Sequence, residues 1–225
     1  MKNKYIIRSR ISEAKFREIL KLFCADLTAS AVGGLTGVSR VTINNIFNSI
    51  RVRILNYQNS INSTIRFSGD VELDESYFGA RRVRGKRGRG ARGKDIVFGI
   101  LKRNEGVYLE IVKKVSKQAL MTIIKGKILS TESTVYTDGW KSYDGLITTG
   151  FKHYRIYHSH NEFARGKNHI NGIESFWSYC KRRLNKFNGS RVNFILHLKE
   201  SEFRFNNRQN DIYHLLLKLI RNDPI

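Results

Sequence analysis

The stretch V-E-L-D-E-S-Y-F-G-A, residues 71–80, has the two-residue periodicity of a β-strand and ends at a turn residue, glycine. Its odd-numbered side chains face one side of the strand, and its even-numbered side chains face the other. Asp74 lies in mid-strand, although aspartate is a poor strand former. Asp74 is therefore a candidate functional residue, whereas Glu72 is expected on an exposed edge face.

The segments that follow predict strands at residues 95–103 and 106–115, a helix at 116–129, a short strand from 133 that ends at Asp138, and a last strand at 151–158. A tight turn at Asn104, Glu105 and Gly106 joins the second strand to the third, so the first three strands form an antiparallel meander. The fourth strand is expected beside the first, which brings Asp138 at its carboxyl end next to Asp74. Ligands bind at this edge of open α/β sheets, although an aspartate before a glycine is equally typical of a plain turn.

Residues 169–184, H-I-N-G-I-E-S-F-W-S-Y-C-K-R-R-L, predict a helix, because apolar side chains recur at three- and four-residue steps. Glu174 lies beside this apolar stripe, and Lys181, seven residues later, points the same way. An acid in that position is costly unless a partner binds it. The partner is either an arginine, in an ordinary ion pair, or a divalent metal.

The expected closeness of three carboxylates favours a divalent metal as the partner of Glu174. The predicted topology brings Asp74, Asp138 and Glu174 together, and like charges a few Å apart raise one another's pKa values. Two Mg²⁺ or Mn²⁺ ions about 4 Å apart would offset this charge and form a centre for phosphoryl transfer. Trp140 and Trp177 could stack on an unpaired base, but packing in the core is the favoured interpretation.

Residues 1–58 predict a small all-α region with the spacing of a helix-turn-helix. Its second helix, capped by Ser39, would expose Arg40, Thr42 and Asn44, which can bind base edges in a major groove. A plain three-helix packing unit is the alternative. Residues 59–69, rich in Asn, Ser and Thr, predict a connector.

The 225 residues include 41 Lys and Arg against 19 Asp and Glu, a net charge of +22, which implies a polyanionic partner. Residues 81–94, R-R-V-R-G-K-R-G-R-G-A-R-G-K, contain no acid and predict a flexible basic loop on a phosphate backbone, or a solvated tether. The loop residues expected to bind DNA are Arg81, Arg82, Arg84, Lys86, Arg87, Arg89 and Arg92.

Other functional classes are disfavoured. The two cysteines lack zinc-finger spacing. No apolar run approaches the ~20 residues that span a membrane, and the apolar stretch near the N-terminus is too short for a signal peptide. We therefore expect no membrane partner and a cytoplasmic, nucleoid-associated protein.

Three phrases, D-E-S-Y-F-G (74–79), Y-T-D-G-W-K-S-Y (136–143) and the stretch 169–184, resemble those of DDE transposases of bacterial insertion sequences, the ISXO-like group. The resemblance implies an α/β fold, with an RNase H-like catalytic domain at residues 70–189 that has a mixed five-stranded sheet flanked by helices. Residues 190–225 would form a helical segment packing on that core. Many relatives begin with a cysteine-rich zinc ribbon, which this chain lacks.

The resemblance also implies roles for individual residues. Asp74, Asp138 and Glu174 would be the catalytic residues and would bind two Mg²⁺ or Mn²⁺ ions. Lys181 and Arg182 would contact DNA. His169 and Asn171 would not bind the metals themselves but would contact the residues that do.

The activity that the resemblance implies is that of a DDE-type transposase, a polynucleotidyl transferase and endonuclease. It would cut double-stranded DNA at the terminal inverted repeats and join the ends to target DNA, as a homodimer or larger assembly. An RNase H-like structure-specific nuclease and a non-catalytic DNA-binding regulator derived from a transposase stay open. The helix-turn-helix and the basic loop favour the transposase, because ends must be recognised and two DNAs held.

Overall fold

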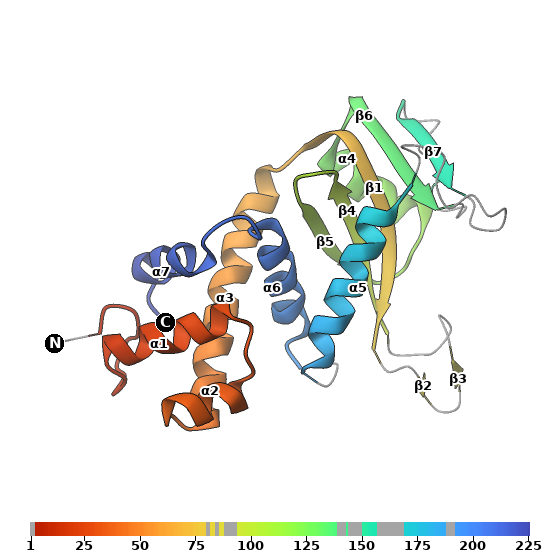
Figure 1. Ribbon diagram of the computed structural model, residues 1–225. Helices are drawn as coiled ribbons and strands as arrows, with labels where there is room; N and C mark the ends of the chain where they lie inside the picture. The colour runs from red at the N-terminus through yellow and green to blue at the C-terminus, as the bar shows by residue number, and fades with distance from the viewer. Residues whose placement is uncertain are drawn as a thin grey trace. The chain divides into compact units, whose positions relative to one another are not determined.

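The structure, a computed structural model, describes residues 3–79, 82–83, 86–87, 94–138, 143, 150–156, 169–187 and 192–225. The chain divides into two compact units (Figure 1). The first, called the helical unit below, comprises residues 1–61 and 192–225. The second, the sheet unit, comprises residues 62–191.

The sheet unit is built on five strands in the spatial order β5-β4-β1-β6-β7. They are β1 (Phe67–Phe78), β4 (Asp95–Lys102), β5 (Val107–Val112), β6 (Ile128–Asp138) and β7 (Lys152–Ile156). β4 is antiparallel to both β1 and β5, whereas β6 is parallel to both β1 and β7. The predicted meander, the placement of the fourth strand beside the first and the mixed five-stranded sheet are thereby confirmed.

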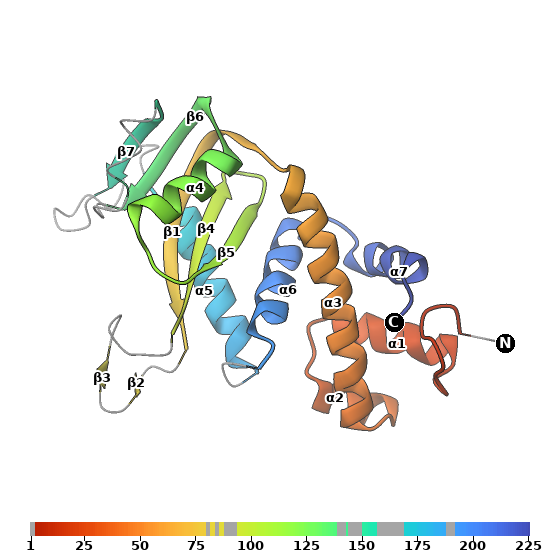
Figure 2. The same cartoon turned by 180° about the vertical axis from the view of Figure 1, so that it is seen from behind.

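Helices cover both faces of this sheet: α4 (Lys117–Lys127) lies on one face and α5 (Asn171–Asn185) on the other (Figures 1 and 2). Val71 and Leu73 of β1 belong to the hydrophobic core that includes the apolar side chains of α4. The alternate residues Glu72 and Asp74 contact α5 instead. The two-residue alternation therefore predicted the two faces of β1 correctly, and Asp74 lies on the face that α5 covers.

The helical unit contains α1 (Glu13–Cys24), α2 (Ala29–Thr36), the first part of α3 (Arg40–Thr64), α6 (Phe194–Asn206) and α7 (Ile212–Asn222). α2 ends at Gly37, whose φ of +70° suits glycine. The Oγ of Ser39 accepts a hydrogen bond from the backbone N–H of Thr42 at 3.2 Å, so Ser39 caps α3 as expected. These helices have the order and the tight turn of the predicted helix-turn-helix.

α3 is longer than the sequence predicts, because it runs to Thr64 and includes residues 59–64 of the expected connector. Asn, Ser and Thr are weak helix formers, and this suggested a break in the chain. Tertiary contacts outweigh that preference: Gln58 and Asn62 are buried, and the Asn62 carbonyl accepts a hydrogen bond from Lys127.

The C-terminal helices contribute to the hydrophobic core of the N-terminal ones. Sequence analysis placed residues 190–225 on the catalytic core, but in the structure residues 192–225 cluster with residues 1–61. The cluster includes Phe16, Ile19, Leu20, Phe23, Ile43, Phe47, Ile50, Phe203, Leu216 and Ile220. The helical unit is thus discontinuous in sequence, and the sheet unit is inserted between its two parts.

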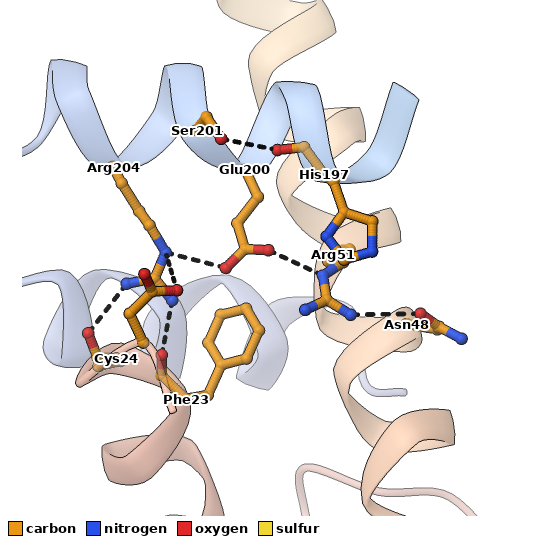
Figure 3. A network of polar contacts seen from close by, with 9 residues as sticks. Phe23, Cys24, Asn48, Arg51, His197, Glu200, Ser201 and Arg204 are labelled. Atoms are coloured by element: carbon orange, nitrogen blue, oxygen red, sulfur yellow. Dashed lines mark hydrogen bonds and ion pairs between the residues drawn. The ribbon is translucent and has the colours of Figure 1, made fainter. Parts of the chain in front are cut away.

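Polar contacts reinforce this closure of the helical unit. Glu200 of α6 forms ion pairs with Arg51 of α3 and Arg204 of α6, and all three side chains are buried (Figure 3). Arg204 also donates hydrogen bonds to the backbone carbonyls of Phe23 and Cys24 at the end of α1. We call Arg51, Glu200 and Arg204 the buried triad.

Part of the predicted basic loop lies within the described residues. β2 (Arg82–Val83) pairs antiparallel with β3 (Lys86–Arg87), so a small hairpin forms in that segment. Arg81, Arg84, Arg89 and Arg92 lie outside the described residues, as does Trp140. In the part of the chain that the structure describes, no helix is both long and apolar enough to cross a bilayer.

Candidate active site

Asp74, Asp138 and Glu174 line a single pocket of about 710 Å³ in the sheet unit. Asp74 lies within β1, Asp138 is the last residue of β6, and Glu174 lies in the first turn of α5. β1 and β6 are adjacent parallel strands paired up to the residues just before the two aspartates. The fold therefore brings together carboxylates from three separate segments, as the sequence predicted.

The pocket is also lined by polar and basic side chains. Ser76 follows Asp74 on the same face of β1, and Ser178 and Lys181 follow Glu174 along α5. Lys94 contributes from the segment before β4. Lys181 is exposed and Lys94 is half-buried. A phosphate group in this pocket would therefore find ammonium and hydroxyl donors beside the carboxylates.

The pKa of Asp74 shows the effect of burial and of the neighbouring charges in the pocket. Burial, and after it the negative charge of Asp138, raises the pKa of Asp74 to about 7, and Glu174 acts in the same direction. Hydrogen bonds from the Glu75 backbone and from the Trp177 side chain lower the pKa and offset part of this rise. The three acids together therefore favour the binding of a proton or a cation.

The donor set suits a hard divalent cation, because carboxylate oxygens are the ligands that Mg²⁺ and Mn²⁺ prefer. Within the described ranges, however, no three acidic, histidine or cysteine side chains stand close enough to share one ion. The chemistry of the residues and the raised pKa of Asp74 thus fit a divalent metal. The three carboxylates would have to approach one another to bind it jointly.

Glu72 docks the first turn of α5 onto β1, contrary to the expectation of an exposed edge position. That prediction was wrong because β1 is a central strand with both faces covered, and Glu72 is fully buried. Its carboxylate accepts hydrogen bonds from the backbone N–H of Ile173 at 2.9 Å and from Nε of Arg103 at 2.8 Å. The first of these satisfies an otherwise unpaired donor of α5, whose N-cap residue Ile170 makes no side-chain cap.

Two glycines permit the close packing of α5 against the sheet. Sequence analysis did not use them, although they mark the positions where α5 approaches. A Cβ at Gly172 would lie 2.8 Å from Oε2 of Glu72, and a Cβ at Gly99 in β4 would lie 2.7 Å from the indole of Trp177. A glycine inside an apolar strand such as residues 95–102 often marks the close approach of another group. Gly99 could therefore have indicated where α5 packs.

The residues predicted to support the metal ligands lie at the start of α5. The backbone carbonyl of His169 accepts a hydrogen bond from Nη2 of Arg103 at 2.6 Å, and its ring Nδ1 lies 3.6 Å from Oε1 of Glu72. Asn171 lines a neighbouring hollow together with Glu174 and Arg182. Their support of metal ligands stays a prediction.

The predicted DNA-binding residues lie on accessible surfaces of both units. Lys181 and Arg182 are exposed on α5, whereas Arg40 and Asn44 are exposed and Thr42 is half-buried on α3. Trp177 is buried, with 4% of its surface exposed, so it packs in the core as favoured.

Replacing Glu72 by glutamine is expected to lower the free energy of unfolding by roughly 1.5–3 kcal/mol. The substitution removes a charge-assisted hydrogen bond and leaves Arg103 without its buried counter-charge. Urea unfolding would measure the change. Glu132→Gln is the control, because Glu132 is exposed on β6 and its substitution should change stability by less than about 0.5 kcal/mol. Equal midpoints for the two variants would contradict the docking role of Glu72.

Comparisons with known proteins show what this chain is similar to. Residues 66–206, which include all three acids, match the family described as the ISXO2-like transposase domain. An uncharacterized transposase-like protein of Haemophilus influenzae is 47% identical over 104 residues, or 46% of this chain and 83% of that protein. An uncharacterized protein in transposable element ISH50 of Halobacterium salinarum is 31% identical over 136 residues, covering 54% of this chain and 46% of that protein.

Solved structures show more distant likenesses. A chain of the simian T-cell lymphotropic virus intasome in complex with PP2A regulatory subunit B56 gamma gives a TM-score of 0.44 at 14% identity, covering 90% of this chain and 74% of that one. A chain of the pre-cleavage Mos1 transpososome gives 0.32 at 12% identity, covering 97% and 80%. Both are too distant to inform on function.

Proposed function

Because the chain belongs to the family of ISXO2-like transposases, we propose that it cuts DNA at the ends of an insertion sequence and joins the freed 3′-hydroxyls to target DNA. One observation carries this proposal: carboxylates from β1, β6 and α5 line the same pocket, where burial and the neighbouring negative charges raise the pKa of Asp74. A regulator that only binds DNA has no use for such a costly arrangement.

In this proposal Asp74, Asp138 and Glu174 hold two Mg²⁺ or Mn²⁺ ions. When bound, the ions activate the attacking water or 3′-hydroxyl and stabilise the charge of the leaving oxygen. Lys181 and Lys94, which line the same pocket, bind the phosphate to be attacked. The hydroxyls of Ser76 and Ser178 orient its oxygens.

Recognition of the DNA is assigned to other surfaces. Arg40, Thr42 and Asn44 at the start of α3 contact base edges in the terminal repeats, and the hairpin segment from Arg82 to Arg87 binds backbone phosphates. A transposase must bring two ends together, so we expect a homodimer or larger assembly on DNA.

A strand-transfer assay tests the proposal. The purified protein is mixed with labelled DNA that carries the inverted repeats flanking its gene, a supercoiled target, and Mg²⁺ or Mn²⁺. Joined product is the expected result. Cleavage without joining would indicate a hydrolytic nuclease, and binding without either reaction in both metals would indicate a regulator.

The salt dependence of DNA binding gives a separate prediction. The affinity should fall steeply with salt, with a log–log slope of about −0.9 for each phosphate neutralised. Lys181→Gln should reduce that slope by about one, because one phosphate contact is lost. Lys117→Gln, an exposed lysine on α4 at the opposite face of the sheet, should leave the slope unchanged. A flat slope for the native protein would exclude DNA as the substrate.

A further inference from the structure

The indole of Trp177 reaches from α5 to the carboxylate of Asp74. Its Nε1 donates a hydrogen bond to Oδ2 of Asp74 at 3.0 Å. Trp177 follows Glu174 by three residues, almost one helical turn, so α5 contributes both a pocket acid and this donor. The indole has a single polar atom, which can only donate. With 4% of its surface exposed, Trp177 uses this donor on Asp74 instead of on water.

Gly99 provides the space for this contact. It pairs with Asp74 in the antiparallel ladder between β1 and β4, so it lies directly beside the acid. A Cβ at Gly99 would lie 2.7 Å from Cζ2 of Trp177 and 2.9 Å from Cδ1 of Ile173. Glycine weakens a strand interior, since it costs entropy and offers no side chain to pack. Here the missing side chain lets the indole lie against the sheet.

The indole is fixed by its neighbours as well as by Asp74. Its ring packs edge-on against Phe78 of β1, with centroids 6.0 Å apart, and lies tilted against Phe176, with centroids 5.4 Å apart. The preceding turn of α5 is held to β1 by the hydrogen bond between Glu72 and Ile173. The N–H donor is therefore set in place by packing, whether or not a ligand occupies the pocket.

We infer that Trp177 is a positioning residue, which orients the Asp74 carboxylate for a divalent cation in the pocket. A carboxylate with one oxygen held by a fixed donor cannot rotate freely, so its remaining lone pairs keep one direction. Partners of this kind typically contribute about 10- to 100-fold to metal affinity or activity. The inference rests on the proposed function, because it assumes that Asp74 binds a cation.

Trp177→Phe tests this inference, since phenylalanine retains an aromatic ring for packing and lacks the N–H. Binding of Mn²⁺ alone, measured without DNA by electron paramagnetic resonance of the free ion, should weaken about 10- to 100-fold. Leu120→Ala is the control for lost packing, because Leu120 is fully buried on α4, at the other face of the sheet from Trp177. It should lower the unfolding midpoint at least as much while leaving Mn²⁺ affinity unchanged.

Fluorescence provides a second readout. In a Trp140→Phe background Trp177 is the only tryptophan, and paramagnetic Mn²⁺ should quench its emission. Adding Asp74→Asn should abolish the quenching.

Two results would overturn the inference, and they have different consequences. If Trp177→Phe binds Mn²⁺ as tightly as the native protein while Asp74→Asn does not, Trp177 only packs and the proposed function stands. If Asp74→Asn still cuts and joins DNA, Asp74 is not a required metal ligand and the inference fails with that assignment, whereas the proposed function itself fails only if the native protein neither cuts nor joins DNA.

Discussion

Replacing Asp138 by asparagine is expected to reduce strand transfer by about a thousandfold while leaving DNA affinity within about twofold. Asparagine has the same size as aspartate, but its neutral amide oxygen binds a divalent ion much more weakly than a carboxylate does. A bound metal supplies several kcal/mol of charge stabilisation in phosphoryl transfer, and each ~1.4 kcal/mol changes the rate tenfold. The strand-transfer assay in Mg²⁺ measures the loss, and a filter-binding titration measures the affinity.

Asp95→Asn is the matched control for this experiment. Asp95 is exposed at the start of β4 and does not line the pocket, so its substitution should leave strand transfer intact. If Asp138→Asn joins ends as fast as the native protein, Asp138 is a turn residue and the pocket does not hold the metals. If both variants lose activity equally, the loss reflects a general effect of removing negative charge near bound DNA.

Local patterns in the sequence were enough to predict the sheet and the three segments that supply the acids of the pocket. The alternation of residues 71–78 follows from the pleat of a strand, which repeats every two residues regardless of the rest of the fold. It therefore separated Leu73, in the core under α4, from Asp74, which contacts α5. Pairing of the fourth strand with the first then placed Asp138 beside Asp74.

Contacts between distant residues were not predictable in this way. Glu72 is buried because Ile173 and Arg103 bind it, and Ile173 is 101 residues away in the chain. A glutamate in an alternating strand is otherwise typical of a solvated face, so periodicity alone favoured the wrong answer. The indole of Trp177 was assigned correctly to the core, but its hydrogen bond to Asp74 depends on the space at Gly99.

Contacts between distant residues of the helical unit were not predictable from local patterns either. Arg51 and Glu200 are 149 residues apart, and neither α3 nor α6 has a pattern that predicts their pairing. Charged residues on a helix usually mark a solvated face, yet Arg51, Glu200 and Arg204 are each less than 10% exposed. Basic residues were interpreted as DNA contacts because of the net charge, whereas these two arginines serve the fold.

Glu200→Gln is expected to lower the free energy of unfolding by about 3–5 kcal/mol, because it removes the buried carboxylate that Arg51 binds and leaves Arg204 with the longer ion pair to Asp26 at 3.8 Å. Nε of Arg51 lies 2.8 Å from one carboxylate oxygen, and Nε of Arg204 lies 2.9 Å from the other (Figure 3). Urea unfolding followed by circular dichroism measures the change. Glu18→Gln is the control: Glu18 pairs with Lys15 on the surface, where such pairs contribute at most about 1 kcal/mol.

Replacing all three members of the buried triad by apolar residues should cost less than Glu200→Gln alone. In the variant Arg51→Met, Glu200→Leu, Arg204→Met all charges of the triad are removed, so the penalty for burying those ions disappears, and the longer ion pair between Arg204 and Asp26 is lost with them. The carbonyls of Phe23 and Cys24 lose their hydrogen bonds from Arg204, so some destabilisation is expected to remain. A triple variant less stable than Glu200→Gln would mean that these backbone contacts, and not the charge balance, hold α1 and α6 together.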